Sequence, residues 1–275
     1  EAVSLLNILF SEISRWCTKN KLTVHPTKCK VMIISRRNFI GPLQNVKWEN
    51  TTLDYTNTIK VLGVIIDNKL SWEPHIKVLM KSLNVQLKTL KRISYLPPQK
   101  LESIYYKMII PYATYCISVW GSCSTSLFET LELLHIKAAR IIHKVPPSLN
   151  DNHVLGKVNW QDLGYIYKKR IAVEMFNIIK SQGNHRLSFM FNLKESKRRG
   201  NEIEMNKTIT EFGRQSLFFR GPVVWNNLDK NAKNSENINI FKSILKKCSK
   251  LIKSISFTKG TCNNRNKNTE DFIYF

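Results

Sequence analysis

The stretch Leu62-Gly63-Val64-Ile65-Ile66-Asp67-Asn68-Lys69-Leu70-Ser71-Trp72-Glu73-Pro74-His75-Ile76 contains the change from strand to helix that decides the fold of this chain. The β-branched run from Ile59 to Ile66 predicts a strand, which Asp67 and Asn68 end. Ser71 is a candidate N-cap, and Pro74 suits a first helical turn because the missing N–H is not needed there. We therefore predict a strand followed directly by a helix from Pro74 to Ser94.

This predicted helix has one apolar face and one cationic face. At about 100° per residue, six apolar side chains fall on one stripe: Ile76, Leu79, Met80, Leu83, Leu87 and Leu90. Five cations fall on another face, called the cationic face below: Lys77, Lys81, Lys88, Lys91 and Arg92. A solvated face usually mixes charges, whereas no acid lies between Glu73 and Glu102. The pattern favours a helix that docks on a core and contacts phosphates. A merely solvated lysine face is the common alternative.

On the N-terminal side, the sequence predicts one helix and several short strands. Apolar residues at helical spacing cover residues 1–19, and the chain opens at Glu1 without an initiator methionine, so we expect a piece of a longer protein. Cys29 to Ser35 is a β-rich run. After a turn at Gly41-Pro42, Val46 to Trp48 and Thr51 to Tyr55 predict a hairpin around Glu49-Asn50.

Helices dominate the C-terminal side. Periodicity and prolines predict helices at Lys100 to Trp120 with a kink at Pro111, at Ser126 to Val145, at Trp160 to Ser181 and at Ile238 to Ile255. Phe212 to Leu228 is apolar and contains a tryptophan. The polar region 183–215 includes a basic loop from Lys194 to Gly200, and we predict disorder from Thr258 onward.

The charge of the chain is strongly unbalanced. Its 275 residues include 43 Lys and Arg against 20 Asp and Glu, a formal net charge of +23, and 43% of them are hydrophobic. This hydrophobic content is typical of a globular protein. The charge favours a polyanionic partner, with nucleic acid ahead of a membrane surface. An AT-rich coding bias would explain abundant lysine but not the scarcity of acids.

Cysteines, histidines and apolar segments favour an intracellular protein without a metal site. The six cysteines (Cys17, Cys29, Cys116, Cys123, Cys248 and Cys262) form no C-x-x-C pair, so we predict reduced thiols. Five histidines share no ligand spacing, and we predict surface or helix-end positions for them: His75, His135, His143, His153 and His185. Neither a signal peptide nor a membrane span is predicted, because polar residues interrupt the best candidate, Ile104 to Trp120.

Three motifs resemble the reverse transcriptases of jockey-like non-LTR retrotransposons. Asn20-x-Leu22-x-Val24-His25-x-x-Lys28 is similar to the Asn-x-Leu-x-x-Asn-x-x-Lys pattern of that family, with His25 where the family usually has asparagine. The run from Leu62 to Ile76 resembles the primer-grip segment of the family. Gly221-Pro222-Val223-Val224-Trp225-Asn226-Asn227-Leu228 resembles its Gly-Pro-x-x-Trp-Asn-x-Leu motif.

The resemblance implies an α+β chain that begins just after the catalytic Asp-Asp hairpin of such an enzyme. The implied parts are the β-rich end of a polymerase palm with the primer-grip hairpin at 1–70, a helical thumb at 71–150, a helical C-terminal region at 151–257 and a disordered tail at 258–275. The chain contains no Asp-Asp pair, so we expect it to be inactive alone. Mg²⁺ is expected for the intact enzyme, where paired acids would bind it, but no cofactor is expected in this chain.

The same resemblance implies roles for individual residues. Lys28 matches a family lysine that can donate a proton to departing pyrophosphate; without the family, a solvated lysine at a strand start is the simpler interpretation. Leu62 and Gly63 lie in the implied primer-grip hairpin, where Gly63 would let a sugar-phosphate backbone approach the main chain. The alternative for Gly63 is a bulge in a buried strand. The cationic face would belong to the thumb and grip the template–primer duplex.

The aromatic residues are predicted to pack in the core. This prediction covers Trp120, Trp160 and Trp225. It also covers Tyr105, Tyr106 and Tyr112, for which stacking on bases is the alternative.

We therefore expect a fragment of an RNA-directed DNA polymerase that binds RNA and DNA as a template–primer duplex in the nucleus, without a membrane. One alternative is a non-catalytic nucleic-acid-binding module of the same ancestry, which an Asp-Asp hairpin upstream of Glu1 would argue against. Another is a helical protein scaffold with coincidental charge, which salt-dependent nucleic-acid binding would exclude. The oligomeric state is left open.

Overall fold

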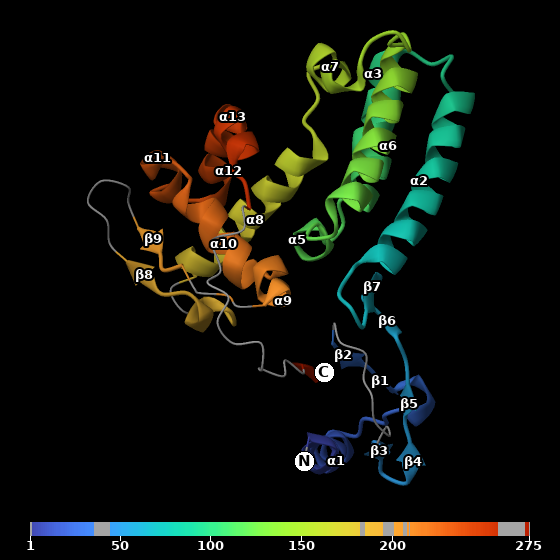
Figure 1. The fold of residues 1–275 in the computed structure, drawn as a ribbon, viewed down its shortest axis with the longest axis vertical. Helices are drawn as coiled ribbons and strands as arrows, with labels where there is room; N and C mark the ends of the chain where they lie inside the picture. Colours follow the sequence, from blue (N-terminus) through green and yellow to red (C-terminus); the bar gives the residue numbers. More distant parts are fainter. Residues whose placement is uncertain are drawn as a thin grey trace. The chain divides into compact units, whose positions relative to one another are not determined.

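The fold combines many helices with small two-stranded sheets, which confirms the predicted α+β class (Figure 1). The computed structural model describes residues 2–35, 45–181, 185–194, 201–205, 208, 210–257 and 273–274. The described residues form two compact units, one containing Glu1–His75 and the strand Ile273–Tyr274, the other beginning at Ile76. The turn predicted at Gly41-Pro42 and most of the predicted basic loop and tail lie outside the described residues.

The first unit consists of one long helix and short strands. Its elements are α1 (Ala2–Lys19), the 3₁₀ turn η1 (Pro26–Lys28), β1 (Lys30–Val31), β2 (Ile33–Ile34), β3 (Lys47–Trp48), β4 (Thr51–Thr52), β5 (Asp54–Tyr55), β6 (Thr58–Val61), β7 (Val64–Asp67) and β10 (Ile273–Tyr274). β1 pairs with β5 in parallel, and the pairs β3–β4, β6–β7 and β2–β10 are antiparallel. Ile273 and Tyr274 therefore form a strand, although we predicted disorder for them.

The core of the first unit lies between α1 and the β3–β4 hairpin. Val31, Val46, Trp48 and Leu53 are buried there, with Val3 and Phe10 of α1 against them. The Phe10 and Trp48 ring centroids are 5.6 Å apart. The other side of α1 exposes large apolar side chains: Leu5, Ile8, Leu9, Ile13 and Trp16. The helix thus buries only part of the apolar surface that its sequence carries.

The strands of the first unit are shorter than the sequence predicts. The predicted hairpin around Glu49-Asn50 is confirmed, with Trp48 opposite Thr51. Cys29 to Ser35 forms two short strands rather than one, because β1 and β2 pair with different partners. The single strand predicted from Ile59 to Ile66 is wrong: a turn at Leu62-Gly63 folds it into the β6–β7 hairpin.

The helices continue from α2 to α13. They are α2 (Glu73–Arg92), α3 (Pro98–Ile104), the π-helical turn η2 (Tyr105–Ile109), α4 (Ile110–Ala113), α5 (Ile117–Trp120), α6 (Thr125–His143), α7 (Asp151–Lys157), α8 (Leu163–Lys180), the 3₁₀ turn η3 (Ser188–Met190), α9 (Glu211–Gln215), α10 (Leu217–Asn226), α11 (Lys230–Lys233), α12 (Ile238–Lys247) and α13 (Ser249–Ser254). One hairpin, β8 (Leu193–Lys194) with β9 (Glu202–Ile203), flanks the basic loop.

Two helical layers make the core of the second unit. α2 and α6 lie side by side, and Leu83 and Leu87 of α2 line the same cavity as Leu131 of α6 (Figure 1). Around α8 pack α10, α12 and α13. Phe176 of α8 stacks on Phe241 of α12 at a centroid distance of 4.5 Å. Trp120, Trp160 and Trp225 are all buried, which confirms their predicted core positions.

Several predicted helices are interrupted for local reasons. The stretch Lys100 to Trp120 passes through η2, where the Ile110 N–H donates to the Tyr105 carbonyl, and breaks again at Cys116 with φ 51°. This wider turn precedes Pro111, whose ring would otherwise clash with the preceding turn. The predicted helix Ile238 to Ile255 is divided at Cys248. α8 begins at Leu163 rather than Trp160, because the Asp162 carboxylate caps it by accepting from the Tyr165 N–H at 2.6 Å.

Candidate nucleic-acid interface

The β6–β7 hairpin presents Leu62 and Gly63 at its tip. Val61 pairs with Val64, so these two residues alone form the loop. Their φ angles are 46° and 90°, a left-handed pair typical of the turn that matches strand twist. Glycine adopts this conformation without steric cost, and Leu62 is 86% exposed. The bulge interpretation of Gly63 is therefore wrong, whereas the hairpin implied by the resemblance is present.

A buried carboxylate organises the corner between this hairpin and α2. Oδ1 of Asp67 accepts from the Lys69 N–H at 3.1 Å and from the N–H and hydroxyl of Ser71, each at 3.0 Å. Oδ2 accepts from the Trp72 N–H at 2.8 Å. Asp67 is only 5% exposed, and its bonds hold Leu70 and Trp72, which both have positive φ. Four hydrogen bonds to one carboxylate hold the loop from Asp67 to Trp72 in one conformation.

The sequence prediction missed the role of Asp67 and placed the N-cap of α2 one residue early. α2 begins at Glu73, so Ser71 lies just before the cap position, although its hydroxyl accepts from the Glu73 N–H at 3.3 Å. The available signal was an aspartate at a strand end, a residue that commonly bonds backbone N–H groups further along its own loop.

α2 presents the cationic face on its exposed side. Lys77, Lys81, Lys88, Lys91 and Arg92 are all exposed. Ile76, Leu79, Leu83, Leu87 and Leu90 are buried, from 0% to 5% exposed. The helix runs from Glu73 to Arg92, close to the predicted bounds. A buried leucine stripe thus holds five cations in a fixed row, an arrangement that suits contact with a row of phosphates.

Lys28 ends the short turn η1 before β1. Its N–H donates to the His25 carbonyl at 3.0 Å, and its side chain is exposed. The His25 ring makes no cap; its Nδ1 lies 2.9 Å from the Thr27 hydroxyl instead. The turn therefore forms with histidine in place of the asparagine of the family. Lys28 and the hairpin tip belong to the first unit and the cationic face to the second, so the predicted site residues fall into three local groups.

A buried polar cluster lies beneath the α2–α6 layer. The Tyr105 hydroxyl is 2.6 Å from His135 Nδ1, and His135 Nε2 is 2.9 Å from the Gln161 carbonyl. Because a carbonyl only accepts, Nε2 carries the proton and Nδ1 accepts from Tyr105. Trp160 stacks on Tyr105 at a centroid distance of 4.8 Å. Burial raises the pKa of Tyr105 and lowers the pKa of His135, so both remain neutral.

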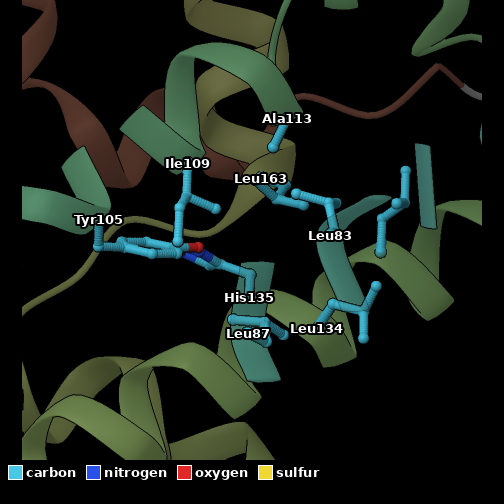
Figure 2. A pocket seen from close by; sticks show the side chains of 9 residues that line it. Leu83, Leu87, Tyr105, Ile109, Ala113, Leu134, His135 and Leu163 are labelled. Carbon is cyan, nitrogen blue, oxygen red and sulfur yellow. The ribbon is translucent and has the colours of Figure 1, made fainter. Parts of the chain in front are cut away.

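Figure 2 shows Tyr105 and His135 of this cluster at the wall of a small cavity. The cavity volume is about 10 Å³, and its lining is mostly apolar: Leu83, Leu87, Tyr105, Ile109, Ala113, Leu131, Leu134, His135 and Leu163. A volume of this size is about the minimum for one water molecule. The cavity is therefore a packing gap under α2 and too small for a nucleotide or cofactor.

Some predicted positions are wrong. His135 is 3% exposed and lies in the middle of α6, so it is neither a surface nor a helix-end residue. His75 is 8% exposed, with the Ile65 N–H 3.4 Å from its Nδ1, but it lies in the first turn of α2 and so has the predicted helix-end position. Tyr105 is buried as predicted, but Tyr106 and Tyr112 are 41% and 43% exposed. Burial of a side chain depends on residues distant in sequence, such as Trp160 beside Tyr105, and local spacing carries no signal for that.

The described residues contain no cluster of three or more His, Cys, Asp or Glu side chains that could hold a metal ion. The sequence also contains no Asp-Asp pair of the kind that binds Mg²⁺ in a polymerase. The described cysteines Cys17, Cys29, Cys116, Cys123 and Cys248 are free thiols. Burial raises the pKa of the Cys123 thiol to about 11, so it is no ready nucleophile. Over the same ranges, every helix is too short or too polar to cross a bilayer.

Two curated proteins are similar to part of this chain. One is the probable RNA-directed DNA polymerase from transposon BS of Drosophila melanogaster, 23% identical over 150 residues, which are 53% of this chain and 17% of that protein. Another is the RNA-directed DNA polymerase from mobile element jockey of Drosophila funebris, 24% identical over 150 residues, 53% of this chain and 16% of that protein. No family model and no solved structure matches the chain.

These similarities relate the chain to RNA-directed DNA polymerases of transposons. Within that class, the relatives include the polymerase of jockey, which confirms the jockey-like resemblance of the sequence motifs. The aligned part spans only 16–17% of the length of these relatives.

Proposed function

We propose that the chain is the C-terminal part of a non-LTR retrotransposon RNA-directed DNA polymerase and that it binds the template–primer duplex. One observation carries this proposal: five exposed cations on α2, with no acid between them, are anchored by a buried leucine stripe. A cation row fixed on a rigid helix can follow phosphates without sequence readout. The names of the relatives support nucleic acid as the partner.

The roles of the remaining predicted residues depend on this proposal. The exposed hairpin tip at Leu62 and Gly63 would contact the primer backbone, and Lys28 would donate a proton to pyrophosphate during chemistry. The catalytic aspartates and their Mg²⁺ would be supplied by the rest of the enzyme. Because target-primed copying takes place at chromosomal DNA, we propose that the intact enzyme works in the nucleus.

Binding of an RNA–DNA hybrid at several salt concentrations tests the proposal. Changing Lys77, Lys81, Lys88 and Arg92 to Gln should weaken binding and flatten the log–log salt slope by about three to four units, at roughly 0.9 per phosphate contact. A control variant with Lys19, Lys100, Lys137 and Lys157 changed to Gln removes the same charge from other exposed positions. Equal slopes in the two variants would mean that the α2 row is only solvated.

A non-catalytic binding module of the same ancestry is the second candidate, favoured by the poor fit of the described acids to paired metal ligands. It predicts the same salt slope. An experiment with the polypeptide upstream of Glu1 distinguishes the two candidates. If the chain is part of a polymerase, joining it to that polypeptide should give Mg²⁺-dependent primer extension; if it is a non-catalytic module, it should not.

A further inference from the structure

α8 and α12 pack against each other (Figure 1). The pair carries a second group of cations. Phe176 stacks on Phe241 between the helices, and the Tyr165 hydroxyl donates to the Leu245 carbonyl at 3.1 Å. Phe241 and Leu245 are fully buried. α12 is therefore fixed on α8 by its apolar face, which leaves its opposite face to solvent.

Three lysines meet on the exposed side of this pair. Lys242 and Lys246 are exposed and one turn apart on α12, so they share a face. Lys169 of α8 is half-buried, and its Nζ lies 5.9 Å from the centroid of the Tyr165 ring. Burial lowers the pKa of Lys169, and the charges of Lys246 and Lys242 lower it further. The fold thus holds three like charges within electrostatic reach of one another.

The acids of α8, α12 and α13 do not offset these charges. Neither α12 nor α13 contains an acidic residue. The acid of α8, Glu174, lies about 140° around the helix from Lys169, at 100° per residue. Other lysines near α8 have partners: Lys253 of α13 forms an ion pair with Asp162 at 2.7 Å, and Lys168 of α8 donates to the Lys253 carbonyl. The three clustered lysines differ from these, because they are placed to repel one another.

We propose that Lys169, Lys242 and Lys246 form a second phosphate-binding surface, called the α8–α12 surface, which holds the sugar-phosphate backbone of a nucleic acid. A phosphodiester placed between the ammonium groups would replace repulsion with charge-assisted hydrogen bonds. The Lys169 ammonium group lies 5.9 Å from the centroid of the Tyr165 ring, a distance at which a cation–π interaction favours this position. The inference rests on the proposed function and adds a contact independent of α2.

The test uses the full chain with Lys169, Lys242 and Lys246 changed to Gln. Binding of an RNA–DNA hybrid and of single-stranded RNA is measured against salt. The slope should fall by about two to three units. A control variant with Lys100, Lys137 and Lys157 changed to Gln removes three exposed charges elsewhere and should keep most of the slope. Thermal unfolding of each variant checks that the fold is retained.

Amine footprinting gives a second measurement on the unmodified chain. Lysine acylation followed by mass spectrometry should show that the hybrid protects Lys169, Lys242 and Lys246. Protection without a slope change, or a slope change equal to that of the control variant, would overturn the inference. If the wild-type chain binds with a steep slope that only the α2 variant flattens, the α8–α12 surface alone is refuted. If the wild-type chain shows no salt-dependent binding, the proposed function fails with it.

Discussion

Glu132 is a carboxyl group that the fold buries with incomplete hydrogen bonding. Its Oε2 accepts from the Leu163 N–H at 2.9 Å, whereas its Oε1 is buried and has no hydrogen-bond partner among the described residues. Burial raises the pKa of Glu132 from 4.5 to about 7. The protonated form is therefore the one that the native structure favours, because a neutral carboxyl loses less solvation on burial.

This raised pKa predicts how the stability of the chain depends on pH. Glu132 holds its proton more tightly in the folded state, so its contribution is complete below pH 4.5 and is lost as pH rises through about 7. The loss amounts to at most about 3 kcal/mol. Glu132→Gln keeps an acceptor for Leu163 and cannot ionise, so it should be more stable than the wild type at pH 8. Urea unfolding between pH 4 and 8 checks this; parallel pH profiles would contradict it.

Lys28 supports a prediction about chemistry rather than stability. In an enzyme rebuilt with the upstream palm, Lys28→Ala should slow the single-turnover rate by about 10²-fold while primer binding stays the same, because proton donation matters only as the phosphoanhydride bond breaks. Lys28→Arg should recover little, since arginine does not release its proton. The side chain is exposed, so neither change should unfold η1. Equal rates at saturating nucleotide would rule out the role.

At the scale of elements, hydrophobic periodicity predicted the bounds of a single helix correctly but did not predict where one strand ends and the next begins. α2 lies close to its predicted bounds because its apolar residues repeat at helical spacing over its whole length. The β6–β7 hairpin was predicted as one strand because Leu62 continues the apolar run across the turn, and only Gly63 marks the loop. The exposure of single residues such as Lys77 was also predictable, because residues opposite the buried apolar stripe of α2 must face solvent.

The pairing of elements explains the rest of what the sequence did not reveal. The α8–α12 surface combines residues more than seventy positions apart, Lys169 and Lys242, and no local pattern indicates that those helices touch. His135 is buried because Tyr105 and Trp160 pack against it. Such contacts depend on tertiary packing, which spacing within one segment does not encode.

For the whole molecule, the charge that favours nucleic-acid binding does not imply catalytic activity. The net charge of +23 favours nucleic acid, but the described acids form no group that could hold a metal. We predict that the purified chain binds primed RNA yet shows no Mg²⁺-dependent primer extension, because paired carboxylates are needed to position the metal ions. Extension of a labelled primer on an RNA template checks this, and any incorporation above background would contradict it.

The π-helical turn η2 lies within a row of buried side chains that runs from α3 into α4. Leu101, Tyr105, Ile109 and Ala113 are all buried, at intervals of four residues. In an α-helix each such step overshoots a full turn by about 40°, so the row drifts around the helix axis. The i→i+5 bond at Tyr105 fits more residues into one turn and winds the row back. The interval alone does not predict a π-turn, because Leu163, Tyr167, Ile171 and Met175 repeat it within the uninterrupted helix α8.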